Sequence, residues 1–149
     1  MKLLISLIFI TGIGIGDKTY VQHFYANGKI KEEGWMQNNT KIDYWHFYYN
    51  DGKVKEEGWF DKNIRNQFWK FNYADGTRQM EGWFKNGLAN KWWVFFKNNS
   101  VMKKAEYSNG KQNGYTLYYD NGKLSMAEKY KDGLRIGQWK DYASFKRDN

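Results

Sequence analysis

One eight-residue phrase recurs along this chain at a fixed interval, and this repetition constrains the fold more than any other feature. KIKEEGWM begins at Lys29, KVKEEGWF at Lys53 and TRQMEGWF at Thr77, so successive copies start 24 residues apart. Looser copies begin at Val101 and Lys123. A fixed period of this length is typical of architectures that stack one supersecondary unit on the next. The sequence therefore predicts about five similar units in a row.

Within one unit, the side chains alternate with a period of two. Trp45, Phe47 and Tyr49 are separated by His46 and Tyr48, which is the pattern of a β-strand and not of a helix. An Asn-Gly or Asp-Gly pair follows such runs, with its glycine at Gly28, Gly52, Gly76 and Gly122. These pairs predict two-residue type I′ hairpin turns, because both central residues of that turn need positive φ.

The second connection of each unit is polar, over residues 61–66, 85–90, 108–114 and 131–137. We expect hairpin loops of four or more residues there. The predicted fold is therefore all-β: an elongated antiparallel meander of about five β-hairpin repeats of roughly 24 residues. Whether Tyr142 to Asn149 begins another strand or frays is left open. With no cysteine in the chain, neither a disulfide nor a thiolate metal site is available.

Six of the eight tryptophans fall into two columns of the repeat. One column holds Trp35, Trp59 and Trp83, and we expect Tyr107 to continue it. The other column holds Trp45, Trp69 and Trp93. Trp92 and Trp139 fit neither column cleanly.

The predicted turns also predict which residues face each other. With Asp51 and Gly52 in the turn, Trp45 lies opposite Gly58, and the same rule places Trp69 opposite Gly82 and Trp93 opposite Glu106. An indole over a glycine covers the backbone that the glycine leaves bare. We therefore assign structural positions in the repeat to the members of this pattern: Trp45, Trp69, Trp93, Gly34, Gly58, Gly82 and the turn glycines Gly28, Gly52, Gly76 and Gly122.

A sheet one layer thick cannot bury both of its faces. One tryptophan series is expected to form the core, and the other to stay partly accessible. The candidate partner-binding aromatics are Trp35, Trp59, Trp83 and Tyr107. The alternative is that both series pack mainly against neighbouring repeats, since the large rings must supply much of the buried area.

The repeat phrase resembles that of a known family. YYNDGKVKEEGWF, and more loosely YYDNGKLSMAEKYKDG, is similar to the MORN-repeat variant of the bacterial YwqK-like antitoxin type, over roughly residues 20 to 142. The resemblance implies β-hairpin repeats that act as an interaction scaffold, with some members proposed to neutralise a companion toxin. Copy four departs from the pattern, because Asn98-Asn99-Ser100 has no turn glycine. A leader peptide is also unexpected in a cytosolic antitoxin.

Residues 1–16 differ from the rest of the chain. A basic start, an apolar run from Leu3 to Ile10, and small residues at Gly14 and Gly16 are typical of a secretory signal peptide. The apolar run is shorter than the ~20 residues of a membrane-spanning helix. We therefore expect a signal peptide over 1–16 and a repeat domain over 17–149. Export to the periplasm, the cell envelope or the medium would follow. An uncleaved anchor or an apolar first strand remains the alternative.

The stretch GIGIGDKT invites comparison with a phosphate-binding P-loop. Asp17 stands where that motif needs its second glycine, and the residues that follow indicate a strand instead of a helix. We predict no nucleotide site here, and no other cofactor is implied.

The residues that carry most enzyme chemistry are scarce or badly placed. His23 and His46 fall in adjacent columns of the repeat, so their side chains are expected on opposite faces of the sheet. The pairs Glu32-Glu33 and Glu56-Glu57 are separated in the same way. The sequence therefore predicts no catalytic residue, no metal ligand set and no enzymatic activity.

Charge gives a weaker indication of partners. Without residues 1–16 the chain has 23 Lys and Arg against 16 Asp and Glu, a net of +7. Such a surface suits nucleic acid, anionic lipid or an acidic protein, or is only solvated. Export would disfavour nucleic acid. We expect a non-enzymatic exported scaffold that binds a protein, in an antitoxin-like or immunity role. The alternative is a module for glycans or anionic lipids of the cell envelope.

Overall fold

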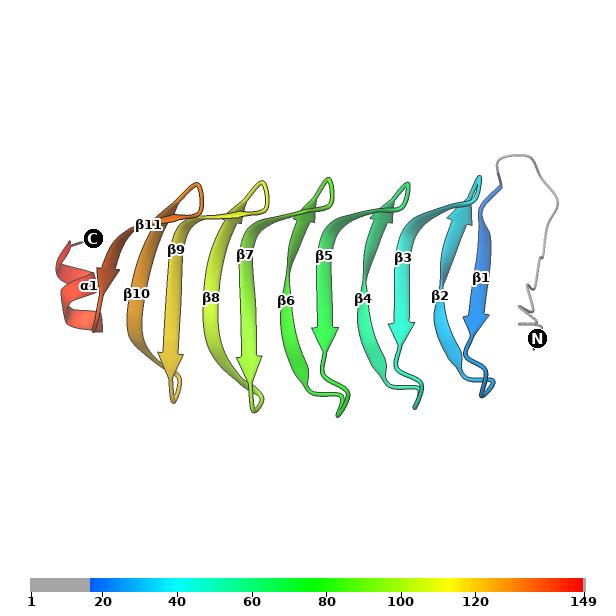
Figure 1. Ribbon diagram of the computed structural model, residues 1–149, viewed down its shortest axis with the longest axis horizontal. Coiled ribbons are helices and arrows are strands. Elements are labelled where there is room, and N and C mark those ends of the chain that lie inside the picture. The colour runs from blue at the N-terminus through cyan, green and yellow to red at the C-terminus, as the bar shows by residue number, and fades with distance from the viewer. Residues whose placement is uncertain (1–16, 149) are drawn as a thin grey trace.

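The computed structural model describes residues 17–148, and the predicted signal peptide at 1–16 lies outside them. Eleven strands form a single antiparallel sheet in which each strand pairs with the next one along the chain (Figure 1). The strands are β1 (Thr19–Phe24), β2 (Ile30–Gln37), β3 (Thr40–Tyr48), β4 (Val54–Asp61), β5 (Ile64–Asn72), β6 (Arg78–Lys85), β7 (Leu88–Lys97), β8 (Ser100–Ser108), β9 (Lys111–Asp120), β10 (Lys123–Lys131) and β11 (Leu134–Trp139). The predicted all-β meander is confirmed.

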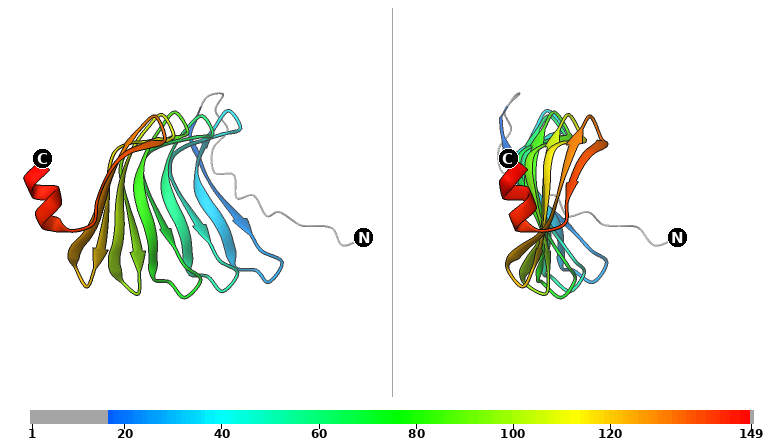
Figure 2. Two further views of the ribbon diagram at one scale, coloured as in Figure 1. Left: turned by 60° about the vertical axis from the view of Figure 1, so that its left-hand side comes forward. Right: turned by 90° about the vertical axis from the view of Figure 1, so that its left-hand side faces the viewer.

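The sheet is one layer thick, and its strands bend along their length while the sheet twists from one end to the other (Figure 2). The C-terminal segment forms neither a strand nor a frayed end, because it folds into the short helix α1 (Tyr142–Asp148). Asp141 caps this helix by accepting a hydrogen bond from the backbone N–H of Ser144 at 2.7 Å. Phe145 of α1 packs on the rings of Trp139 and Tyr115, so the helix is anchored to the end of the sheet.

The hairpin ends at the bottom of Figure 1 differ from the prediction. At Gly28, Gly52 and Gly76 the turn is a three-residue loop in which the glycine alone has positive φ, of 80°, 95° and 94°. This is a type I turn followed by a glycine bulge, and the two-residue prediction is wrong there. The reason is visible at Asn27, whose side chain accepts a hydrogen bond from the N–H of Lys29 at 3.1 Å and so stabilises the longer loop.

The two-residue turn is confirmed at Asn121 and Gly122, where φ is 49° and 76°. The connections at the top of Figure 1 were expected to be longer loops, and that prediction is wrong. Asn86 and Gly87 form a two-residue turn there, with φ of 51° and 77°, and Asn109 and Gly110 form another, with φ of 49° and 79°. Asparagine tolerates this conformation, and the strands extend into the polar segments because pairing satisfies their backbone groups.

The predicted register holds through the first three repeats. Trp45 pairs with Gly58 and Trp69 pairs with Gly82. The prediction for Trp93 is wrong, since its partner in β8 is Ala105. The turn between β7 and β8 has one residue fewer than the loops before it, so every later residue of β8 moves by one position in the register.

Candidate interaction surface

The first face of the sheet, called here the Trp45 face, carries Trp45, Trp69 and Trp93 and holds the core. Trp45 and Trp69 are fully buried, and Trp93 is nearly so. Each indole lies over the glycine of the preceding strand, so Trp45 covers Gly34 and Trp69 covers Gly58. The predicted cover of Gly58 by Trp45 is therefore wrong, although the two residues are paired in the register. A Cβ atom on Gly34 would come within 2.4 Å of the Trp45 ring, and one on Gly58 within 2.3 Å of the Trp69 ring. These positions therefore require glycine.

The same indoles also make a polar contact that the sequence did not reveal. The Nε1–H of Trp45 donates to the carbonyl oxygens of Trp35 at 3.0 Å and Ile42 at 3.1 Å. A bulge in β3 brings these carbonyls together, and Asp43 at the bulge has φ of 56°. The bulge recurs at Gln67 and Lys91, with φ of 59° and 58°. Positive φ at these residue types leaves no readable mark in the sequence.

Charged side chains seal the first two of these tryptophans from solvent. Lys41 places its ammonium 4.0 Å from the centre of the Trp45 ring and pairs with Glu32 at 2.6 Å. In the next repeat Arg65 and Glu56 occupy the corresponding positions, with Arg65 4.4 Å from the centre of the Trp69 ring. Apolar residues take the corresponding positions in the third repeat, where Met80 and Ala89 pack against the core cluster that contains Trp93. The Trp45 face is thus closed by side chains of the chain itself.

The opposite face, called here the Trp35 face, leaves a row of rings open. Trp35, Trp59 and Trp83 expose 40%, 37% and 38% of their surface. Each meets a smaller ring edge to face, and the ring centres are 5.3 Å apart for Tyr20 and Trp35. We call this series the exposed ring row. It has one member in each strand from β1 to β7: Tyr20, Trp35, Tyr44, Trp59, Phe68, Trp83 and Trp92.

Four of the seven members of this row were not predicted from the sequence, although their spacing was regular. Tyr20, Tyr44, Phe68 and Trp92 also recur every 24 residues. Trp92, which fitted neither tryptophan column, is the fourth member of this series and is 38% exposed. The mixture of Tyr, Phe and Trp hid a column that one residue type would have made obvious.

Tyr107 does not continue the row of Trp35, and that prediction is wrong. Its ring packs against Trp93 at a centre-to-centre distance of 6.3 Å, on the Trp45 face. Burial there raises the pKa of Tyr107. The register change in β8 is the cause, because it places Glu106 opposite Trp92 and so ends the exposed ring row.

The histidines and the paired carboxylates are divided between the faces, as predicted. His23 lies opposite Glu32, and its Nδ1 is 2.7 Å from a Glu32 oxygen. His46 lies opposite Glu33 and Glu57. Since Glu32 and Glu33 are adjacent in β2, the two histidines belong to opposite faces. Within residues 17–148, no group of three or more acidic or histidine side chains is arranged to hold a metal ion.

The carboxylates between the strands are held by hydrogen bonds. Burial raises the pKa of Glu33, but hydrogen bonds from Tyr48 and Gln22 outweigh it, and the net pKa is lowered. Burial and the Glu33 carboxylate together raise the pKa of Tyr48. These hydrogen bonds link neighbouring strands and so stabilise their pairing.

Positive charge gathers toward the C-terminal end of the sheet. Residues 91–148 contain 12 Lys and Arg against 6 Asp and Glu, a net of +6, whereas residues 17–90 contain 11 against 10. The exposed ring row lies mostly in the nearly neutral part. The exposed ring row and the basic C-terminal part of the sheet therefore differ in chemistry as well as in position.

In the described part of the chain, no helix has the length and apolar character needed to cross a membrane.

In comparisons with known proteins, no family model and no curated protein matches this chain. The resemblance to the MORN-repeat variant thus stays a prediction from the repeat phrase.

Proposed function

We propose that the protein is a non-enzymatic, exported scaffold that binds another protein through the exposed ring row. The observation that supports this most is the regular exposure of Trp35, Trp59 and Trp83, each open to about two-fifths of its surface on a face with no second layer over the described sheet. Aromatic side chains in such a position are the residues that contribute most to protein interfaces.

The electrostatics of the row favour a protein partner over a charged polymer. The row lies over strands whose charges nearly cancel, and adjacent ion pairs such as Lys70 with Glu57 already satisfy one another. A partner would gain mainly by covering apolar ring surface. An antitoxin-like or immunity role is the narrower form of the proposal, and it rests on the resemblance of the repeat phrase alone.

The experiment uses the chain from residue 17 onward as bait on an extract of cell-envelope and secreted proteins from the same organism. Three baits are compared at moderate salt: the wild-type chain, a variant with Trp35→Ala, Trp59→Ala and Trp83→Ala, and a control variant with Tyr73→Ala, Leu134→Ala and Tyr142→Ala. The control removes exposed apolar surface outside the row. Far-UV circular dichroism checks that each bait is folded.

We expect one protein to bind the wild-type and control baits and to be lost from the tryptophan variant. The purified partner should then bind the wild-type chain at least about tenfold more tightly than the variant. Equal binding to all three baits would contradict the assignment of the row. Saturable binding of a purified envelope glycan through the row, with no protein retained, would favour the glycan-binding alternative.

A further inference from the structure

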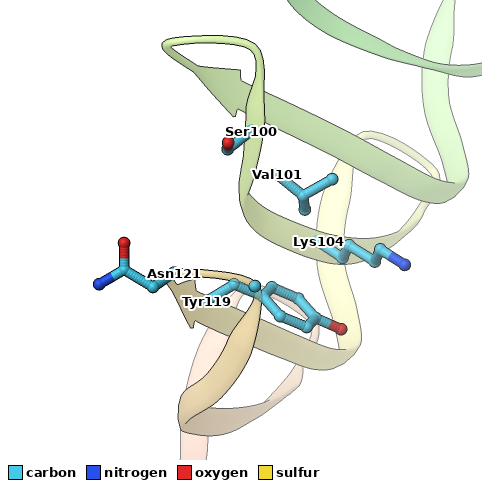
Figure 3. A pocket seen from close by; sticks show the side chains of 6 residues that line it. Ser100, Val101, Lys104, Tyr119 and Asn121 are labelled. Carbon is cyan, nitrogen blue, oxygen red and sulfur yellow. The ribbon is translucent and has the colours of Figure 1, made fainter.

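A hollow of about 480 Å³ lies between the start of β8 and the end of β9, and it is lined by no residue of the exposed ring row. Its lining is Ser100, Val101, Lys104, Tyr119, Asn121 and Gly122 (Figure 3). The Lys104 ammonium is 5.6 Å from the centre of the Tyr119 ring. Figure 3 shows the ammonium and the phenolic oxygen on one side of the hollow, with the polar ends of Ser100 and Asn121 on the other.

The earlier hairpin ends are joined by tyrosine hydrogen bonds, and no such bond between described residues joins the strand ends at this hollow. At the first hairpins, the Tyr25 hydroxyl donates to the carbonyl of Tyr48 at 2.6 Å, and Tyr49 donates likewise to Asn72 at 2.8 Å. These bonds tie each hairpin end to the next. The short turns at 98–99 and 121–122 have no such side chain, and pairing between β8 and β9 begins only at Lys103. The strand ends are left apart.

The charge around this hollow is positive and largely uncompensated. Within the described chain, no carboxylate lies at ion-pair distance from Lys104. An adjoining hollow of about 240 Å³ shares Ser100 and Tyr119 and adds Lys97 and Asp120 to the rim. The two lysines therefore exceed the single aspartate, in the half of the sheet that carries most of the net charge.

We propose that this hollow binds a phosphate group. The ammonium of Lys104 supplies charge, and the hydroxyl of Tyr119 is a neutral donor on the same side of the hollow, while Ser100 and Asn121 offer a hydroxyl and an amide at the opposite side. A phosphate has several acceptor oxygens and suits a mixed set of this kind. The group can belong to a free phosphate compound or to a phospholipid headgroup, and the experiment separates the two. The site shares no residue with the exposed ring row, so either proposal can fail without the other.

The first measurement is a titration of the ¹⁵N-labelled chain with inorganic phosphate at low ionic strength, followed by NMR. We expect saturable shifts confined to residues 100–104 and 119–122. Lys104→Gln should weaken binding at least about tenfold, as loss of a charged hydrogen-bond donor does. Lys55→Gln is the matched control, because Lys55 also stands over a tyrosine, 5.9 Å from the ring centre of Tyr49, and lines neither hollow. Binding by this variant should change less than about twofold.

The second measurement is co-sedimentation with vesicles of phosphatidylcholine, with and without phosphatidylglycerol. Binding only to the anionic vesicles, lost in Lys104→Gln and kept in Lys55→Gln, identifies a lipid headgroup as the source. Saturable phosphate binding without vesicle binding identifies a free phosphate compound. The proposal is overturned if neither probe gives Lys104-dependent binding. It is also overturned if both variants lose binding equally, because overall charge would then explain it.

Discussion

At the scale of single residues, the fold depends on pairs of one glycine and one tryptophan. Each indole covers the bare backbone of the opposite glycine and uses its N–H to satisfy carbonyls at a bulge. Burying an indole without a partner for its N–H would cost free energy, so packing and hydrogen bonding require the same geometry. This combination explains how a one-layer sheet keeps Trp45 and Trp69 fully buried.

Gly34→Ala should destabilise the chain strongly for its size. The added methyl group would lie 2.4 to 2.6 Å from three atoms of the buried Trp45 ring, which cannot move without losing its own contacts. We expect the free energy of unfolding to fall by about 3 kcal/mol, at the upper end for overpacked cores. Urea denaturation followed by fluorescence measures it. Lys31→Ala, at an exposed site of the same strand, should change stability by no more than about 0.5 kcal/mol. Similar values for the two variants would contradict the packing described here.

Some residue positions in the sheet could be predicted from the sequence, and others could not. The pairing of Trp45 with Gly58 was predicted from a two-residue turn. It holds although the loop has three residues, because the register shifts by one beside the loop, between Phe47 and Tyr48. The bulges at Asp43, Gln67 and Lys91 could not be predicted, since three different residue types have positive φ at this position of the repeat. Tyr107 was misplaced because one missing turn residue reverses the faces of a strand.

At the scale of elements, hairpins are held together by shared carboxylates. The clearest case is Glu128 of β10, whose side chain is 6% exposed and accepts hydrogen bonds from Tyr118, Tyr130 and Arg135 at 2.8 to 2.9 Å. Burial raises the pKa of Glu128, but these bonds outweigh it, and the net pKa is lowered. The same carboxylate, with burial as the larger cause, raises the pKa of Tyr118 to about 12. One charge therefore links β9, β10 and β11.

This carboxylate should make the stability of the chain depend on pH. The pKa of Glu128 is lower in the folded state than in the unfolded state. Its contribution to the free energy of unfolding is therefore complete above the ordinary glutamate pKa of about 4.3, and is lost as the pH falls through the lowered pKa of the folded state. Glu128→Gln should lower the free energy of unfolding by about 1 to 3 kcal/mol near neutral pH. Urea denaturation at a series of pH values should show this deficit shrinking on acidification below about pH 4. A deficit that stays constant into acid would rule out the charged form as its source.

Turns were the elements that sequence reasoning described least well. The presence of Asn-Gly and Asp-Gly marked the hairpin ends correctly, but not the length of the loops. A side-chain bond from Asn27 selects a three-residue loop at one end, while asparagine pairs such as Asn38-Asn39 allow two-residue turns at the other. Such preferences differ by small energies, and tertiary contacts between neighbouring hairpins decide them.

At the scale of the whole molecule, the two faces of the sheet have different roles. The Trp45 face is closed by its own lysine, arginine and methionine side chains, whereas the Trp35 face keeps its rings accessible. The sequence predicted the division into two tryptophan series, but not which was open, because alternation alone does not say what covers a face. Lys41 and Arg65 stand over the Trp45 and Trp69 rings in the folded sheet, whereas the sequence indicates only that they are charged residues of a strand.

The most direct test of this division is the hydrogen exchange of the indole N–H groups, measured by NMR on the chain from residue 17 onward. Trp45, Trp69 and Trp93 donate these protons to carbonyls from buried positions, so we predict slow exchange that approaches the rate of global unfolding. Trp35, Trp59 and Trp83 are two-fifths exposed, and their indole protons should exchange orders of magnitude faster. Equal protection of both series, or slower exchange in the Trp35 series, would contradict the assignment of one face to the core and the other to contact with a partner.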